Sequence, residues 1–148
     1  MKVKFFYLAV FIVALAAVVI VVGIAISPQG LVYFDNRGDF YYKKGEYQKA
    51  AEEYKKIINR DPYIIQAYHK LGRIYLRKGF YDKAKAVYQA ALAKDPNFIE
   101  IINDLGIIYF REKLYKKAEE QWEKALKLDP EFTPARKNLK KYKTMFRK

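Results

Sequence analysis

Apolar, small and polar positions recur along residues 31–132 with a period of 34 residues. The copies span residues 31–64, 65–98 and 99–132, and seven positions hold the same residue in all three. These positions are Gly38, Gly72 and Gly106; Tyr41, Tyr75 and Tyr109; Tyr47, Tyr81 and Tyr115; Lys49, Lys83 and Lys117; Ala50, Ala84 and Ala118; Asp61, Asp95 and Asp129; and Pro62, Pro96 and Pro130. A fixed period of this length predicts an array of supersecondary units, each stacked on its neighbours.

Each copy predicts two helices joined by a tight turn. The glycine lies on the first helix and the alanine twelve residues later on the second, so two small residues let the helices cross closely. In the turn, Gly45 and Gly79 tolerate a left-handed helix end, whereas the third copy has Lys113, so we expect its turn to be the most strained. Proline cannot continue a helix, so each Asp-Pro pair separates two copies. We predict helices at 31–44, 47–59, 65–78, 81–93, 99–112 and 115–127.

A seventh helix is predicted after Pro130, from Thr133 to Phe146. A stack of helix pairs leaves its last apolar face open, and its terminal element needs a polar outer surface. This helix has one apolar side and several lysines elsewhere, so we expect residues 133–148 to form a basic capping helix. The apolar side holds Ala135, Leu139, Tyr142 and Phe146.

The three copies resemble the tetratricopeptide repeat, a 34-residue helix-turn-helix with the pattern W-x2-L-G-x2-Y, A-x3-F, P. The second copy carries this pattern as Tyr68, Leu71, Gly72, Tyr75, Ala84, Tyr88 and Pro96, and the third as Ile102, Leu105, Gly106, Tyr109, Ala118, Trp122 and Pro130. The first copy departs from it at Arg37, where leucine is usual, and at Ile57, where a small residue is usual. The resemblance implies an all-α solenoid of three repeats; it does not by itself imply a function.

The N-terminus predicts a transmembrane helix. Residues 5–26 contain no charge, amide or hydroxyl apart from Tyr7. At about 1.5 Å per residue they span the roughly 30 Å hydrocarbon layer. The alternative is a cleaved secretory signal, but its apolar core would have only about 7 to 15 residues, and Pro28 directly follows the small-x-small site best placed for cleavage, at 25–27. We favour an uncleaved anchor, joined to the first repeat by a linker at 27–30.

Positive charge predicts the orientation of this helix. Lys2 and Lys4 lie in the short flank at 1–4, whereas the first basic residue after the helix is Arg37. We therefore expect a single-pass protein of the cell membrane with a cytoplasmic N-terminus and its repeats outside the cytoplasm, in the periplasm if the cell is Gram-negative. Lys43 and Lys44 favour the opposite orientation.

Small residues recur every seven positions within the predicted membrane helix. Ala9, Ala16 and Gly23 fall on one face, which would let a partner helix approach closely. The alternative is that a segment rich in Ala and Val produces this spacing by accident, and it is the stronger of the two.

Net charge narrows the classes of partner. All but Lys2 and Lys4 of the 29 Lys and Arg, and all 16 Asp and Glu, follow residue 30, which leaves a net charge of +11 there. A basic domain favours anionic lipid, acidic proteins or nucleic acid, and outside the cytoplasm nucleic acid is the least expected. A lysine-rich surface that is simply solvated is the default alternative to a lipid contact.

The sequence gives an enzymatic function little support. It has one histidine, His69, one serine, Ser27, and two threonines, Thr133 and Thr144, and it has no cysteine. No pair of nucleophile and base, no metal-ligand cluster and no phosphate-binding glycine loop can be assembled from them. We expect neither catalysis nor a cofactor or metal.

The resemblance also implies a concave surface, formed by the first helices, on which a partner segment lies. At its positions 12 and 13, the copies set Tyr42, Leu76 and Phe110 beside Lys43, Arg77 and Arg111. Arginine forks bind carboxylates and aromatic anchors contribute binding energy, so we predict a partner segment with acidic and apolar residues; the alternative is a solvated face. The full predicted set is Asp39, Tyr42, Lys43, His69, Arg73, Leu76, Arg77, Asn103, Ile107, Phe110 and Arg111.

One specialised type of repeat can be set aside. The chaperone-binding type clamps a terminal carboxylate with Lys, Asn and Arg at five positions, which here hold Asp35, Asp39, Lys70, Glu100 and Asp104. The charge of that clamp is largely reversed.

From the membrane helix and the repeats together, we expect a membrane-anchored scaffold for protein-protein interaction, in the assembly of a membrane or envelope complex. The alternative is a permanent accessory subunit held through its membrane helix and the surface of the solenoid.

Overall fold

The computed structural model describes residues 37–146, which are all-α. Residues 37–43 are helical, and six further helices follow. They are α3 (Tyr47–Arg60), α4 (Ile65–Arg77), α5 (Tyr81–Leu92), α6 (Ile99–Arg111), α7 (Tyr115–Leu128) and α8 (Thr133–Phe146). Each of the six begins at the predicted residue and ends within one residue of the prediction.

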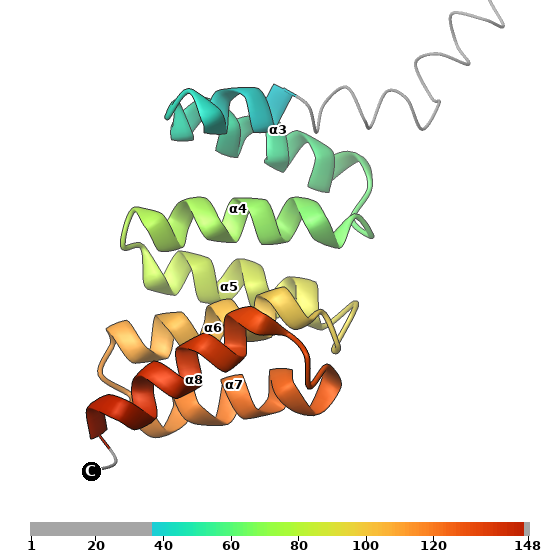
Figure 1. Cartoon of the computed structure of the whole chain (residues 1–148). Helices are drawn as coiled ribbons and strands as arrows, with labels where there is room; N and C mark the ends of the chain where they lie inside the picture. Colours follow the sequence, from blue (N-terminus) through green and yellow to red (C-terminus); the bar gives the residue numbers. More distant parts are fainter. Residues whose placement is uncertain (1–36, 147–148) are drawn as a thin grey trace, which may run out of the picture.

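The helices form a curved solenoid of antiparallel pairs (Figure 1). Contacts join helices that follow one another and also join the first helix of one repeat to that of the next, α4 to α6 and α6 to α8. Among the described helices, no comparable contacts join α3, α5 and α7. The first helices therefore line the inner, concave side, and the second helices line the outer side.

The repeated glycines let an aromatic ring from the second helix pack against the first. A Cβ atom on Gly72 would overlap the ring of Tyr88, and Gly38 and Gly106 face Tyr54 and Trp122 in the same way. Tyr54, Tyr88 and Trp122 are at most 3% exposed. The predicted close crossing is confirmed, and Tyr88 lies directly against the glycine.

Backbone geometry explains the signals at both kinds of turn. Gly45 and Gly79 have φ angles of 78° and 77°, and Lys113 adopts the same left-handed conformation at 63°, alone among the described residues other than glycine. In the Asp-Pro junctions the aspartate side chain accepts a hydrogen bond from the backbone N–H two residues later, at 2.9 to 3.0 Å. The predicted turns are therefore confirmed, with strain confined to the third.

Helix α8 caps the stack. Ala135, Leu139 and Tyr142 are buried in one cluster with Ala118 and Trp122. Phe146 is 46% exposed, and its ring lies against that of Tyr115 with centroids 4.4 Å apart. The predicted capping role is confirmed for the first three apolar residues, and Phe146 lies at the edge of the cluster.

The predicted membrane helix at 5–26, with Ala9, Ala16 and Gly23, lies outside the described residues, as do the flank at 1–4 and the linker at 27–30. Within residues 37–146, none of the helices has both the length and the apolar character needed to cross a bilayer.

Candidate partner-binding surface

All eleven predicted groove residues lie on first helices, but the structure places them in three environments. Lys43, Arg73, Arg77 and Arg111 are exposed, and Asp39, Tyr42, His69, Ile107 and Phe110 are partly buried. Leu76 and Asn103 are 8% and 5% exposed. A partner can therefore touch the first nine directly, whereas Leu76 and Asn103 support the surface from inside.

The acidic group of the first repeat is satisfied by neighbouring side chains. Tyr54 Oη donates to Asp39 Oδ1 at 2.6 Å, and Lys70 Nζ donates to Asp39 Oδ2 at 3.0 Å. Burial raises the pKa of Asp39, but these hydrogen bonds and the charges of Lys70 and Lys43 outweigh it and hold the pKa below its usual range. Asp39 is thus an ionised, internally paired group rather than an open acidic site.

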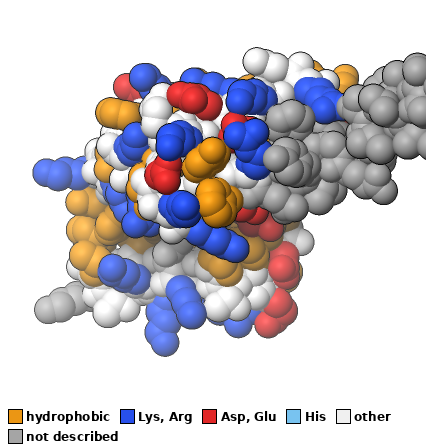
Figure 2. Space-filling model, turned by 90° about the horizontal axis from the view of Figure 1, so that it is seen from above, with side chains coloured by type: hydrophobic (Ala, Val, Ile, Leu, Met, Phe, Trp, Pro, Cys, Tyr) orange, Lys and Arg blue, Asp and Glu red, His pale blue; other side chains and the backbone are white. Residues whose placement is uncertain are grey.

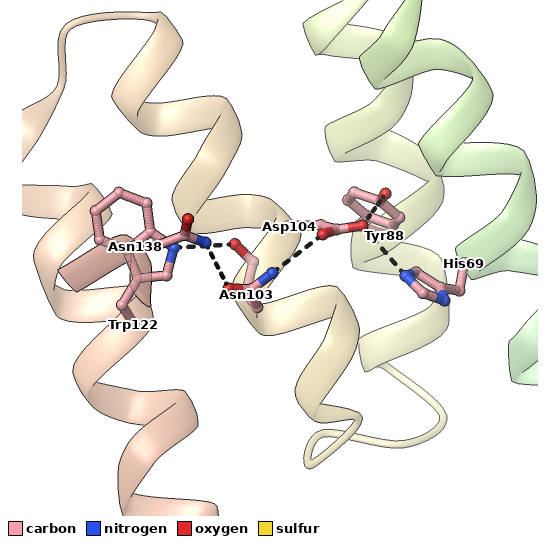
Figure 3. Close-up of polar contacts among 6 residues, drawn as sticks. All are labelled: His69, Tyr88, Asn103, Asp104, Trp122 and Asn138. Atoms are coloured by element: carbon pink, nitrogen blue, oxygen red, sulfur yellow. Dashed lines mark hydrogen bonds and ion pairs between the residues drawn. The ribbon is translucent and has the colours of Figure 1, made fainter. Parts of the chain in front are cut away.

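A second carboxylate, Asp104, anchors the middle of the groove (Figure 3). Tyr88 Oη donates to Asp104 Oδ2 at 3.0 Å, and His69 Nε2 lies 3.1 Å from the same oxygen. Burial, with the Asp104 carboxylate beside it, raises the pKa of Tyr88, so its hydroxyl stays protonated and acts as the donor. His69 is therefore tied to the third repeat by a contact that joins α4 to α6.

The polar network continues from Asp104 to the capping helix. Asn103 Nδ2 donates to Asp104 Oδ1 at 3.3 Å, and Asn138 Nδ2 on α8 donates to Asn103 Oδ1 at 2.9 Å. Trp122 Nε1 donates to the Asn103 backbone carbonyl at 3.2 Å. Asn103 thus links the second helix of its repeat and the capping helix (Figure 3), which is a positioning role.

The exposed cations of the groove differ from these paired groups. Lys43, Arg73, Arg77 and Arg111 form no ion pair with any residue in the described range 37–146. The guanidinium of Arg77, at the end of α4, lies 5.1 Å from the ring centroid of Tyr47, at the start of α3. Lys and Arg side chains are also spread over the face of the molecule that Figure 2 shows. Positive charge is thus what the groove offers to a partner.

Two hollows lie along this row of cations. One, of about 90 Å³, is lined by Asp39, Tyr42, Tyr54, Lys70 and Arg73. The other, of about 260 Å³, lies between α6 and α8 and is lined by Ile107, Phe110, Arg111, Trp122, Asn138, Lys141 and Tyr142. Each hollow therefore joins predicted residues to side chains that the sequence analysis missed.

The 34-residue spacing of the repeats already points to some of the residues that were missed. Asp39, Arg73 and Ile107 are 34 residues apart, and continuing that step past Pro130 reaches Lys141. Similarly, Tyr54 and Tyr88 occupy the same repeat position and each donates to a carboxylate. The prediction ended the repeat count at residue 132 and so overlooked the contribution of α8 to the concave side.

The described residues contain no group of three or more His, Asp and Glu side chains placed to hold a metal ion. The expectation that the chain is not an enzyme and takes no cofactor stays a prediction from its sequence.

Comparison with known families agrees with the repeat geometry. A tetratricopeptide repeat model matches residues 69–131, and a second TPR repeat model matches residues 38–79. Residues 38–131 are therefore similar to the tetratricopeptide repeat (TPR) family. Members of this family are generally protein-interaction scaffolds without enzymatic activity. No curated protein sequence matches the chain.

Solved structures share the TPR fold. The first TPR of Spaghetti (RPAP3), bound to the HSP90 peptide SRMEEVD, is 23% identical with a TM-score of 0.73, and the match covers 85% of this chain and 100% of that one. The second TPR domain of human RPAP3, in complex with the HSP70 peptide SGPTIEEVD, is 23% identical with a TM-score of 0.70, covering 79% and 98%. The Yersinia enterocolitica type III secretion translocator chaperone SycD is 21% identical with a TM-score of 0.75, covering 83% and 98%. At such identities these similarities establish the fold alone.

Proposed function

We propose that this TPR domain binds an acidic and apolar segment of another protein on its concave face, and that the chain holds the domain at a membrane. The observation that carries the proposal is the row of exposed cations, Lys43, Arg73, Arg77 and Arg111, without ion-pair partners in the described part of the chain. Guanidinium groups bind carboxylates in a two-pronged geometry. Aromatic and aliphatic side chains beside the row supply apolar contacts.

Structural relatives support a protein partner. The two RPAP3 domains hold peptides ending in EEVD, which are acidic segments. In this chain three positions of the chaperone-type clamp hold Asp39, Lys70 and Asp104, and all three are engaged in contacts within the domain. We therefore propose a segment recognised along the Arg77 and Arg111 row, with no requirement for a terminal carboxylate.

The membrane part of the proposal is supported by residues 5–26 of the sequence. An apolar segment of this length, followed by a four-residue linker, would hold the repeats next to the bilayer. There, the lysine-rich surface would be close to anionic headgroups, and a groove facing neighbouring proteins suits a role in assembling a membrane or envelope complex.

Site-specific crosslinking tests the groove. A benzoylphenylalanine photocrosslinker replaces Tyr42, which is partly buried on the concave side, or Tyr63, which is 78% exposed between α3 and α4. In native membranes we expect the Tyr42 variant to form one dominant crosslinked product and the Tyr63 variant to lack it. The same product from both positions, or none from Tyr42, would contradict groove binding.

Charge reversal separates a groove partner from a permanent subunit. The full-length chain is extracted in mild detergent, and the mass and composition of the particle are compared between wild type and the Arg77→Glu/Arg111→Glu variant. Lys124→Glu/Lys127→Glu, on the exposed face of α7, is the control of equal charge. We expect the groove variant alone to lose the partner. Stoichiometric partners that survive both variants and moderate salt would instead indicate an accessory subunit held elsewhere.

A further inference from the structure

We infer that α8 is part of the partner-binding surface, and that the pocket between α6 and α8 takes one large apolar side chain of the acidic segment. This inference rests on the proposed function and makes it specific. It assigns to α8 a role in recognition in addition to capping the stack.

The pocket has the size and lining of an anchor site. Its volume is about 260 Å³, and a cavity of about 150 Å³ is enough for a benzene molecule. The indole of Trp122 and the ring of Tyr142, 3% and 7% exposed, line it together with the partly buried Ile107 and Phe110. An aromatic or leucine side chain would therefore contact three rings and Ile107 on one side and the polar Asn138, Arg111 and Lys141 on the other.

The charged side chains at the rim of the pocket indicate which class of partner segment it would bind. Arg111 on α6 and Lys141 on α8 both line the pocket, both are exposed, and neither forms an ion pair with another described residue. Two cations beside an apolar hollow complement an apolar residue flanked by carboxylates. Since Lys43, Arg73 and Arg77 lead along the same concave side to Arg111, one acidic segment would extend from this pocket over the earlier repeats.

The hollow beside Asp39 is a poorer anchor point than the α6–α8 pocket. Asp39 and Lys70 occupy the hollow of the first two repeats and pair with each other at 3.0 Å, leaving about 90 Å³. In the middle, Asp104 holds His69 and Tyr88. The α6–α8 pocket thus has more room for a partner side chain than the hollow beside Asp39.

The position of α8 is fixed well enough to form a binding wall. Asn138 donates to Asn103 at 2.9 Å, and Leu139 and Tyr142 are buried against the last repeat. At the far end of α8, Phe146 packs on Tyr115 and lies 6.3 Å from Phe110 between ring centroids. A pocket with rigid walls loses little conformational entropy when it is filled.

The test begins with a library of random dodecapeptides displayed on phage and selected on the full-length chain in mild detergent. We expect selected peptides to pair Asp or Glu with one large apolar residue, and expect Ala at that residue to weaken binding by at least about tenfold. Trp122 is the only tryptophan in the chain and lines the pocket. A selected peptide made without Trp, with 4-bromophenylalanine as its apolar residue, should quench the fluorescence of Trp122.

Variants assign the contact to α8. Lys141→Glu should weaken peptide binding at least about tenfold, since it puts a like charge beside the acidic segment, and Ile107→Phe should do the same by filling the pocket. Lys140→Glu is the matched control, because Lys140 lines a different hollow, on the side of Leu126 and Lys143. It should change affinity less than about twofold. Circular dichroism and thermal unfolding confirm that each variant is folded.

The outcomes distinguish the inference from the function on which it rests. If no peptides are enriched, or if enriched peptides bind the Arg77→Glu/Arg111→Glu variant equally well, the proposed function and the inference both fail. A second outcome is that binding is lost in that variant, is unchanged by Lys141→Glu and Ile107→Phe, and leaves the fluorescence of Trp122 unchanged. In that case α8 is only a cap and the inference is overturned. Loss of peptide binding both in that variant and in the Lys141→Glu and Ile107→Phe variants, with quenching of Trp122 fluorescence, supports the inference.

Discussion

At the scale of single residues, the glycine of each repeat determines how closely its two helices approach. Gly72→Ala would place a methyl group into the ring of Tyr88, which is 0% exposed and has no room to move. We expect a loss of about 1 to 3 kcal/mol in the free energy of unfolding, the usual cost of overpacking a core. Urea unfolding measures this, with Arg73→Ala, the adjacent exposed residue, as the control. A difference within about 0.5 kcal/mol of that control would contradict the packing account.

Asp39 predicts a dependence of stability on pH. Because its pKa is lowered on folding, its contribution is fully present above the unfolded pKa, about 3.9, and is lost as the pH falls through the lower folded pKa. We expect Asp39→Asn to lower the melting temperature at pH 7 and to differ progressively less from wild type as the pH falls below about 4. The exposed Glu120→Gln is the control. A difference that stays constant with pH would show that Asp39 acts only through its neutral contacts.

Sequence reasoning assigned residues to faces better than it assigned their contacts. It placed all eleven groove residues on first helices, because a 34-residue period fixes which positions share a side. It did not show that Leu76 and Asn103 are buried, nor that Asp104 joins His69 and Tyr88. These contacts depend on the angle between helices from different repeats, and no local pattern contains that angle.

At the scale of elements, helix boundaries were predictable because their signals are local. The aspartate of each Asp-Pro pair hydrogen-bonds to a backbone N–H two residues later, and the turn residues take positive φ values. The seventh helix was also predicted with its bounds, from Thr133 to Phe146. Its part in the concave surface was missed, since Lys140 stands where the repeats have their glycine. The 34-residue step nevertheless continues into it, from Leu71 and Leu105 to Leu139 and from Ile107 to Lys141.

The third inter-helix turn predicts a stabilising substitution. Lys113 has φ of 63° where the other two repeats have glycine, and a left-handed conformation costs a residue with a Cβ atom about 1 to 2 kcal/mol. Lys113→Gly should raise the free energy of unfolding by up to about 1 kcal/mol, since the greater freedom of glycine in the unfolded chain offsets part of the gain. Gly79→Ala in the second repeat should have the opposite sign. Equal signs for the two variants, measured by urea unfolding, would show that φ does not determine stability here.

At the scale of the whole molecule, the arrangement of charge connects the fold to its proposed partners. The cations of the concave side face away from the convex side and lack described ion-pair partners, whereas Asp39 and Asp104 are satisfied within the domain. The sequence alone showed a net charge of +13 and the register of the basic positions. Which charges remain open to a partner depends on how neighbouring repeats pair their side chains, and this required the three-dimensional structure.

The predicted orientation decides which partners the basic domain can meet. The chain has no cysteine, so Lys94→Cys, at an exposed position after α5, gives a single thiol on the repeats, and Val3→Cys gives one on the N-terminal flank. A membrane-impermeant maleimide should label the Lys94→Cys variant on intact spheroplasts and the Val3→Cys variant only after lysis, because positive flanks stay in the cytoplasm. The reverse pattern would refute the outward orientation. It would place the row of Arg77 and Arg111 beside the anionic inner leaflet and return nucleic acid to the set of expected partners.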